Sequence, residues 1–224
     1  LASRGAAVAA GEAREAHLAK ARWAAGELGL ANVDFIQADV RSLADLGLGT
    51  FDVVLCMGIV YHLRAAEAVE LLRQVGLHAE RLAVIEGQVS LRPRARAGTG
   101  GREYHGSPVP EPPAPWSAVE NTESFWLTRP SLLNALGDAG FTSILETATP
   151  FVEELAAYRD HVQLVAFKGE RVQLAVAPQV AAAPDRVPER TVRRAHPDQG
   201  RRSRWMERVA ELRGRGLSAV FTKR

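Results

Sequence analysis

The sequence has little of what defines several large protein classes. Its 224 residues include one cysteine, Cys56, so an intrachain disulfide is excluded and a reducing compartment is expected. No apolar run approaches the roughly 20 residues that span a bilayer, and neither end shows the basic-then-apolar pattern of a signal peptide. We therefore expect a cytoplasmic protein with no membrane partner.

Motifs of several enzyme classes are also missing. The six histidines have no metal-ligand spacing with the cysteine or with one another, so no metal is expected. Neither the G-x-S-x-G elbow nor the G-x-x-x-x-G-K-[ST] phosphate loop occurs. The string Gly98-Thr99-Gly100-Gly101 does not lie between a predicted strand and a predicted helix, which favours flexible coil.

Basic charge is concentrated at the C-terminal end. Residues 186–224 contain 12 of the 28 Lys and Arg but only 4 of the 26 Asp and Glu, a net charge of +8 that leaves −6 for residues 1–185. Such a tail indicates contact with nucleic acid or an acidic partner, or else a solvated, disordered end. Both interpretations remain open.

Hydrophobic patterning predicts strands in alternation with helices, which favours a doubly wound, mostly parallel α/β sheet. The segment 51–57 is nearly continuous apolar, as a strand covered on both faces would be. The predicted strands are 6–10, 32–38, 51–57, 82–86, 142–147 and 161–168, and the predicted helices are 13–28, 65–78 and 131–139. The first helix would turn Leu18, Ala21, Ala25 and Leu28 inward, and the second Ala68, Leu71, Leu72 and Val75.

Three segments stand outside this alternation. Leu1 to Gly5 reads as a last helical turn stopped by glycine, and we expect a truncated chain. Residues 87–123 hold six of the twelve prolines and predict a long loop, either functional or disordered. After Pro178 the composition predicts a linker and one short helix. The expected domains are 1–177, with an acceptor-side loop over 87–127, and a tail over 178–224.

Two acids follow predicted strands. Open parallel sheets bind ligands outside the carboxyl ends of their strands. Glu12 can accept both hydrogen bonds of a ribose diol, or can serve as a helix-capping acid. Asp39 can hold an amino group, or can form a turn.

These strand ends resemble those of the class I S-adenosylmethionine-dependent methyltransferases. The resemblance covers roughly residues 1–168 and rests on Glu12-Ala13-Arg14, Ala38-Asp39-Val40, Phe51-Asp52-Val53-Val54-Leu55 and Tyr61-His62-Leu63. It implies a Rossmann-like fold, with the last two strands as an edge hairpin and the final strand antiparallel. It also implies methyl transfer from S-adenosylmethionine to an O, N or C nucleophile of a small molecule.

The resemblance also implies roles for particular residues. Glu12 would hold the ribose, Asp39 would accept from the adenine amino group, and the Val40 amide would reach the ring. The other residues expected to border the cofactor are Gly11, Ala13, Cys56, Met57 and Tyr61. We expect the Cys56 thiol to be packed rather than reactive. His62 is either a general base or a structural histidine.

Asn121 to Pro130 resembles a subgroup related to the transfer RNA wobble-uridine carboxymethyltransferases and their small-molecule-acting relatives. The subgroup implies that Tyr104, Trp126 and Arg129 bind the acceptor substrate. The alternatives are alkylation of a transfer RNA and a non-catalytic, truncated relic. The family's glycine-rich first strand and loop are not in the sequence. We therefore expect a sheet without its first strand, and weak or no binding of S-adenosylmethionine by this chain alone.

Overall fold

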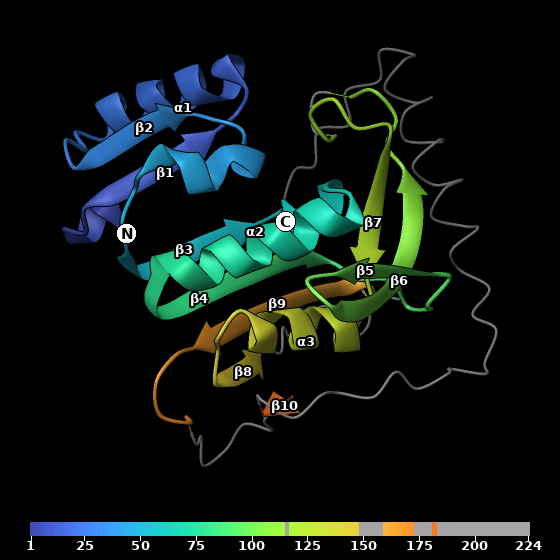
Figure 1. Cartoon of the computed structure of the whole chain (residues 1–224). Helices are drawn as coiled ribbons and strands as arrows, with labels where there is room; N and C mark the ends of the chain where they lie inside the picture. Colours follow the sequence, from blue (N-terminus) through green and yellow to red (C-terminus); the bar gives the residue numbers. More distant parts are fainter. Residues whose placement is uncertain (115–116, 148–158, 173–180, 183–224) are drawn as a thin grey trace, which may run out of the picture.

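The computed structural model describes residues 1–114, 117–147, 159–172 and 181–182 (Figure 1). Its strands fall into three sheets, of two, five and three strands. In chain order the elements are η1 (Ala2–Arg4), β1 (Val8–Glu12), α1 (Glu15–Glu27), β2 (Val33–Gln37), η2 (Val40–Leu46), β3 (Phe51–Met57), η3 (Val60–His62), α2 (Ala65–His78), β4 (Ala79–Gln88), β5 (Ala95–Thr99), β6 (Arg102–Pro110), β7 (Glu123–Leu127), α3 (Arg129–Asp138), β8 (Ser143–Glu146), β9 (His161–Phe167) and β10 (Ala181–Ala182).

The first sheet is a small N-terminal unit. Strands β1 and β2 pair in parallel from Val8 with Val33 onward, and α1 contacts both. Of the helix, only Leu18 and Ala25 are buried. The expectation that Leu28 faces inward is wrong, because the helix ends at Glu27 and Leu28 is 72% exposed. Ala21 is also exposed. A sheet of two strands is too narrow to cover a full helical face.

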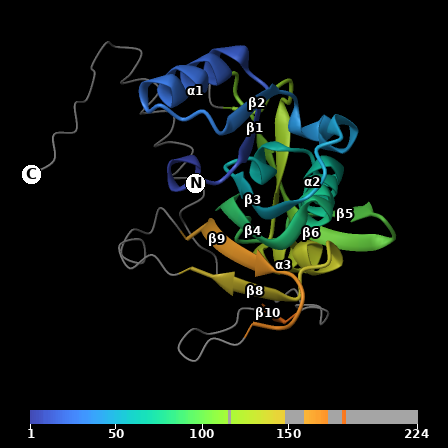
Figure 2. The same ribbon diagram turned by 90° about the vertical axis from the view of Figure 1, so that its left-hand side faces the viewer.

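The second sheet has the order β10-β8-β9-β4-β3, and Figure 2 shows these strands from bottom to top with the β1–β2 pair above β3. Only β3 and β4 pair in parallel, whereas β9 is antiparallel to both β4 and β8. The expected edge hairpin with an antiparallel last strand is confirmed. The expected mostly parallel sheet is not, because antiparallel pairs outnumber the two parallel pairs of the first two sheets.

The hydrophobic core lies on one face of this second sheet, under α2 and α3. The α2 residues predicted to point inward are all buried. The two helices approach closely at Gly76, where a Cβ atom would stand 2.2 Å from the carbonyl oxygen of Ala139. Every buried member of the main core cluster lies between Cys56 and Ala166.

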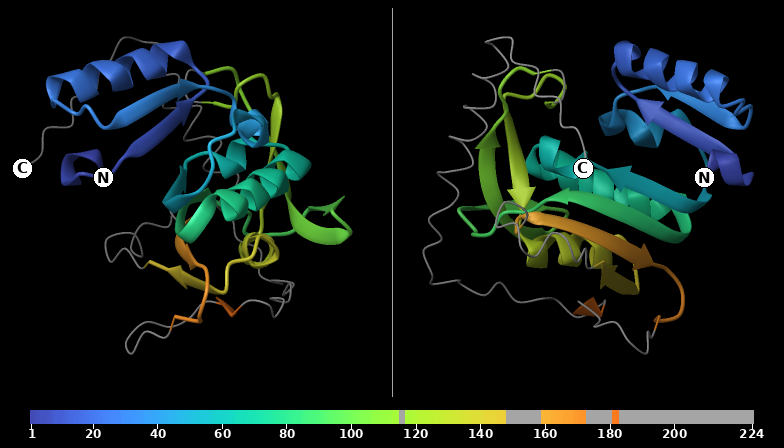
Figure 3. Two further views of the ribbon diagram at one scale, coloured as in Figure 1. Left: turned by 60° about the vertical axis from the view of Figure 1, so that its left-hand side comes forward. Right: turned by 180° about the vertical axis from the view of Figure 1, so that it is seen from behind.

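The opposite face of the second sheet is far less covered. Val53, Leu55 and Met57 of β3 alternate along the strand and are 37%, 50% and 45% exposed. Seen from behind, in the right panel of Figure 3, the strands of this sheet lie in front of α2 and α3. The two helices therefore cover one face only, whereas a doubly wound sheet has helices on both.

The third sheet occupies the segment predicted to be a loop, and that prediction is wrong. Strands β5, β6 and β7 form an antiparallel sheet that contacts α2 and α3. Of the predicted glycine-rich coil, Gly98 and Thr99 are the end of β5, and Gly100 and Gly101 form the first hairpin turn at φ 59° and 73°. Pro108 and Pro110 are tolerated in β6 because that part of the strand pairs only with β7.

Most of the predicted tail lies outside the described residues. This holds for the tail helix and for the domain boundary at 177. Within the tail, the structure describes only β10, which pairs antiparallel with β8. No helix among the described residues is long and apolar enough to cross a bilayer.

Candidate functional site

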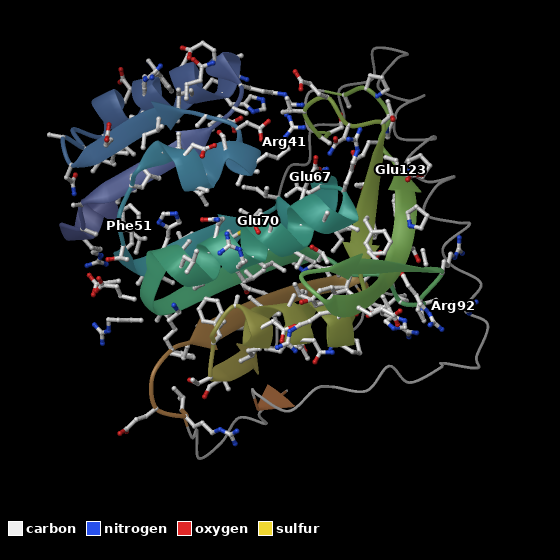
Figure 4. The ribbon with its side chains drawn as sticks, in the orientation of Figure 1. Arg41, Phe51, Glu67, Glu70, Arg92 and Glu123 are labelled. Atoms are coloured by element: carbon white, nitrogen blue, oxygen red, sulfur yellow. The ribbon has the colours of Figure 1, made fainter. Side chains whose placement is uncertain are left out.

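The candidate site lies where the parallel strands end. Glu12 is the last residue of β1, Asp39 follows β2, and Gly58 follows β3. The guanidinium of Arg41 contacts Asp39 on one side and, at 3.9 Å, Glu67 of α2 on the other. In Figure 4 the labelled Arg41 and Glu67 lie close together between η2 and α2. This contact joins the carboxyl edge of the first sheet to the second.

Glu12 holds the turn before α1 and keeps an accessible oxygen. Its Oε1 accepts a hydrogen bond from the backbone N–H of Arg14 at 2.8 Å. Because Arg14 is the residue that precedes the helix, this bond orders the turn and is not the helix cap that the sequence left open. The Oε2 of Glu12 lies 3.5 Å from His17 Nδ1, and the side chain is 36% exposed. A carboxylate oxygen has two lone pairs, so Glu12 can still accept from a ligand hydroxyl.

Asp39 is more fully engaged. Arg41 donates to it through Nε at 3.0 Å, Nη2 at 2.6 Å and the backbone N–H at 2.8 Å. The side-chain hydrogen bond from Arg41 is the main cause that lowers the pKa of Asp39. The turn-forming role is therefore present, and a ligand amino group would share the lone pairs that Arg41 leaves.

The two residues at the end of β3 face opposite sides. Cys56 is buried in the core under α2, and burial raises its thiol pKa to about 12. The expectation of a packed thiol is confirmed. Met57 points to the other face and is 45% exposed. Of the two, only Met57 offers its side chain to a ligand.

An aromatic group follows β3. The rings of Tyr61 and His62 are 4.3 Å apart, and Trp126 of β7 meets Tyr61 edge-on at 6.0 Å. Gly87 makes room for this group, because a Cβ atom there would stand 2.7 Å from the Tyr61 ring. Tyr61 and Trp126 therefore form one wall beside His62.

His62 has a carboxylate partner that sequence reasoning missed. Its Nδ1 lies 3.0 Å from Oε1 of Glu111, whose side chain is only 8% exposed. Asn121 donates its side-chain N–H to the His62 carbonyl oxygen at 3.0 Å. No local signal pointed to Glu111, because it lies in the segment predicted to be a loop.

A second histidine–carboxylate pair was also missed. Glu86, near the end of β4, contacts His161, the first residue of β9. A Cβ atom on Gly58 would lie 3.9 Å from Glu86 Oε2 and 4.0 Å from the Tyr61 hydroxyl. The strand predicted over 82–86 ended on this acid, which is the signal that would have found it.

The predicted substrate-binding residues do not converge. Trp126 joins the aromatic wall described above. Tyr104 is 2% exposed, and its hydroxyl donates to Asp138 at the C-terminal end of α3. Arg129 pairs with Glu146 at 2.7 Å, at the opposite end of the same helix. Ten helical residues extend about 15 Å, so Tyr104 and Arg129 are held apart by their own partners.

The described residues also bear on metal binding. No group of three or more His, Cys, Asp or Glu side chains among them is arranged to hold a metal ion.

Residues 1–78 match the sequence model of a methyltransferase domain. No sequence of a curated protein matches the chain significantly. The solved N-terminal domain of EvdMO1 with S-adenosylhomocysteine bound is similar, with a TM-score of 0.59 and 26% identity over 74% of this chain and 66% of that chain. The same domain in the presence of S-adenosylhomocysteine and D-fucose has the same TM-score and identity, over 74% of this chain and 67% of that chain.

A magnesium protoporphyrin IX methyltransferase from Synechocystis PCC 6803, with S-adenosylhomocysteine bound, aligns with a TM-score of 0.49 and 20% identity, over 75% of this chain and 67% of that chain. The present chain thus spans about two thirds of the length of these relatives.

Proposed function

We propose that this chain is part of a class I S-adenosylmethionine-dependent methyltransferase, as its matched domain and its fold suggest, and that the protein methylates an O, N or C nucleophile of a small molecule. The observation that carries the proposal is the position of Glu12 and Asp39 at the carboxyl ends of two adjacent parallel strands. The EvdMO1 domain similar to this chain was solved with S-adenosylhomocysteine, which supports the same cofactor here.

The acidic end of the site fits the nucleoside of that cofactor. When bound, S-adenosylmethionine supplies an electrophilic methyl group. Glu12 would hold the ribose hydroxyls through its accessible Oε2. Asp39 would reach the adenine amino group only through lone pairs not used by Arg41, so Glu12 is the stronger of the two determinants.

The acceptor side has the groups that a small molecule needs. Tyr61 and Trp126 form an aromatic wall against which an apolar acceptor can pack. His62, beside this wall, would take the proton of the attacking hydroxyl or amine. Because correct placement supplies much of the rate of a displacement reaction, the wall matters as much as the base.

The described residues leave the place of one strand open. Strand β1 pairs only with β2, and β3 only with β4, among the parts of the chain that the structure describes. The exposed Val53, Leu55 and Met57 lie along the uncovered face of the same strand, β3. Unpaired edges and bare apolar faces are normally covered in native proteins. We propose that a further parallel strand, followed by a glycine-rich turn, fills the place in the complete protein and completes the cofactor site.

Calorimetric titration of S-adenosylhomocysteine tests both parts of the proposal. We expect no micromolar binding to the 224-residue chain, and micromolar binding to a chain extended upstream to its natural start. In the extended chain, Glu12→Ala should weaken binding by about 10- to 100-fold, the effect of losing a charged hydrogen bond of ~1.5–3 kcal/mol.

Glu15→Ala is the matched control, because Glu15 is a neighbouring exposed acid that pairs with Arg22 and lies outside the site. Micromolar binding to the 224-residue chain would contradict the missing strand. If the extended chain also fails to bind, the cofactor assignment is wrong and the non-catalytic relic is favoured.

A further inference from the structure

We propose that Glu111 is a positioning residue that holds His62 in the tautomer whose Nε2 is basic. This inference rests on the proposed function, in which His62 takes a proton from the acceptor. It names the group that prepares His62 for that task. The match to the methyltransferase-domain model covers residues 1–78 and does not reach Glu111, and the family resemblance assigns Glu111 no role.

The contact between the two side chains is short and sheltered. Oε1 of Glu111 lies 3.0 Å from Nδ1 of His62, and the two side chains are 8% and 22% exposed. A contact of this length between a histidine and a carboxylate is a hydrogen bond. Because Glu111 is nearly buried, water competes for the interaction less than it would at the surface.

The direction of this hydrogen bond fixes the tautomer of His62. An ionised carboxylate only accepts hydrogen bonds, so the proton of neutral His62 must sit on Nδ1. The lone pair of Nε2 is then the one that can accept a proton. When His62 gains that proton, the Glu111 carboxylate stabilises the imidazolium, as the orienting acid does in other histidine-based sites.

The segment that carries Glu111 is fixed around His62 at several points. Oε2 of Glu111 accepts from the Ala118 backbone N–H at 3.4 Å, and Asn121 donates to the His62 carbonyl oxygen at 3.0 Å. On the side of the first sheet, Arg14 donates to the Ser117 carbonyl oxygen at 2.7 Å. The segment therefore has anchors at both the base and the cofactor end of the site.

A residue with a strained backbone lies close to Glu111 in the sequence. Glu120, at φ 61°, is the one residue other than glycine with a positive φ among those that the structure describes. Its carboxylate lies 3.4 Å from Nη2 of Arg41, the partner of Asp39. Such conformations persist where the surroundings over-determine them, and they concentrate at functional sites. This observation is independent of the His62 contact.

In the proposed methyl transfer, Glu111 would support the movement of the acceptor's proton to His62. The acceptor atom forms a bond to the methyl carbon, and the electron pair of the breaking carbon–sulfur bond stays on sulfur. The acceptor's proton moves to Nε2 of His62 and is later released to water. Glu111 exchanges no atom in this step and acts only through His62.

NMR spectroscopy of the 224-residue chain, without cofactor, tests the inference directly. Long-range proton–nitrogen correlations of the His62 ring should show Nδ1 protonated and Nε2 bare at neutral pH. In Glu111→Ala, the ring should shift toward the Nε2–H tautomer that a solvated neutral histidine side chain prefers. Glu111→Gln should retain the wild-type tautomer, because its amide oxygen still accepts from Nδ1.

Glu103→Ala is the matched control, since Glu103 contacts another histidine, His105, at 3.2 Å. It should leave the His62 signals unchanged. An Nε2–H tautomer of His62 in the unmodified chain would overturn the inference, even if Glu111→Ala fails to fold. A tautomer unaffected by Glu111→Ala would overturn it as well. Because no cofactor is added, the result does not depend on the calorimetric test of the proposed function.

Discussion

The N-terminal unit of β1, α1 and β2 contrasts with the unit built on β3, β4, β9 and β8. In the first, α1 buries only Leu18 and Ala25 against a two-stranded sheet. In the second, two helices and a further sheet enclose a continuous core from Cys56 to Ala166. The predicted cofactor acids, Glu12 and Asp39, both belong to the N-terminal unit or its edge. The part expected to hold the nucleoside therefore has the least core of its own.

The polar contacts between the two units are mostly made by arginines. Arg14 reaches the Ser117 carbonyl oxygen, and Arg41 reaches Glu67 and Glu120. Contacts of this kind at the surface are individually weak and are screened by salt. We therefore expect the N-terminal unit to depend on what binds or packs beside it, whereas the second unit has a core of its own.

The largest expected effect comes from truncating a buried leucine, and its consequences should differ between the two units. Leu72 of α2 is fully buried in the main core, and Leu72→Ala should lower the free energy of unfolding by about 2–5 kcal/mol. Leu18 of α1 is 1% exposed but lies in the small unit. Leu18→Ala should speed hydrogen exchange in β1 and β2 while leaving β4 and β9 protected. Equal loss of protection in all four strands would show that the two units unfold as one.

A smaller effect on stability is expected from replacing a helical glycine by alanine, and its sign should differ between the two units. Gly76→Ala in α2 should destabilise the protein by about 1–3 kcal/mol, because the new Cβ would stand 2.2 Å from the Ala139 carbonyl oxygen. Gly26→Ala in α1 is the matched control, since nothing lies within 4 Å of its Cβ position. It should stabilise α1 by about 0.5 kcal/mol through helix propensity.

Urea unfolding measures the first of these changes, and hydrogen exchange in α1 measures the second. A neutral or stabilising Gly76→Ala would show that α2 and α3 are not closely packed in solution, and that the contrast between the two units is overstated.

The smallest effect concerns the Asp39–Arg41 pair. Because the hydrogen bond from Arg41 lowers the pKa of folded Asp39, its contribution is fully present above the ordinary aspartate value of 3.8 and is lost as the pH falls through the lowered native value. The pair is partly exposed, so Asp39→Asn should cost at most about 1 kcal/mol at pH 7 and nothing in strong acid.

Unfolding of wild type and variant across this pH range measures the difference. Glu70→Gln provides a matched comparison in the second unit, where Arg73 lowers the pKa of Glu70 in the same way. A stability difference between Asp39→Asn and wild type that does not change with pH would contradict the account.

Elements with a strong local pattern could be predicted from the sequence. The bounds of β3 and α2 coincide with the predicted segments 51–57 and 65–78. Thr128 caps α3, the helix predicted over 131–139, by accepting from the Ser131 N–H. In these cases a run of apolar residues, a helical repeat or a capping side chain acts over a few neighbouring residues, so no distant partner is needed to decide the structure.

The third sheet shows why other elements could not be predicted. Its prolines indicate a loop when β6 is considered alone, but they lie where the strand has a free edge. Tyr104 was predicted to bind substrate, yet its position in β6 turns it into the core. Both outcomes depend on which strands pair, and pairing is a property of the assembled sheet.

The sequence by itself determined the order of the first strands and helices, the two acids at strand ends and the resemblance to methyltransferases. Each of these is recorded in short stretches of chain. Only the tertiary structure decided that Glu111 meets His62 and that Glu86 meets His161. These contacts join residues 49 and 75 positions apart. Side-chain hydrogen bonds of this kind follow from how sheets and helices pack, so the local sequence pattern around each residue does not predict them.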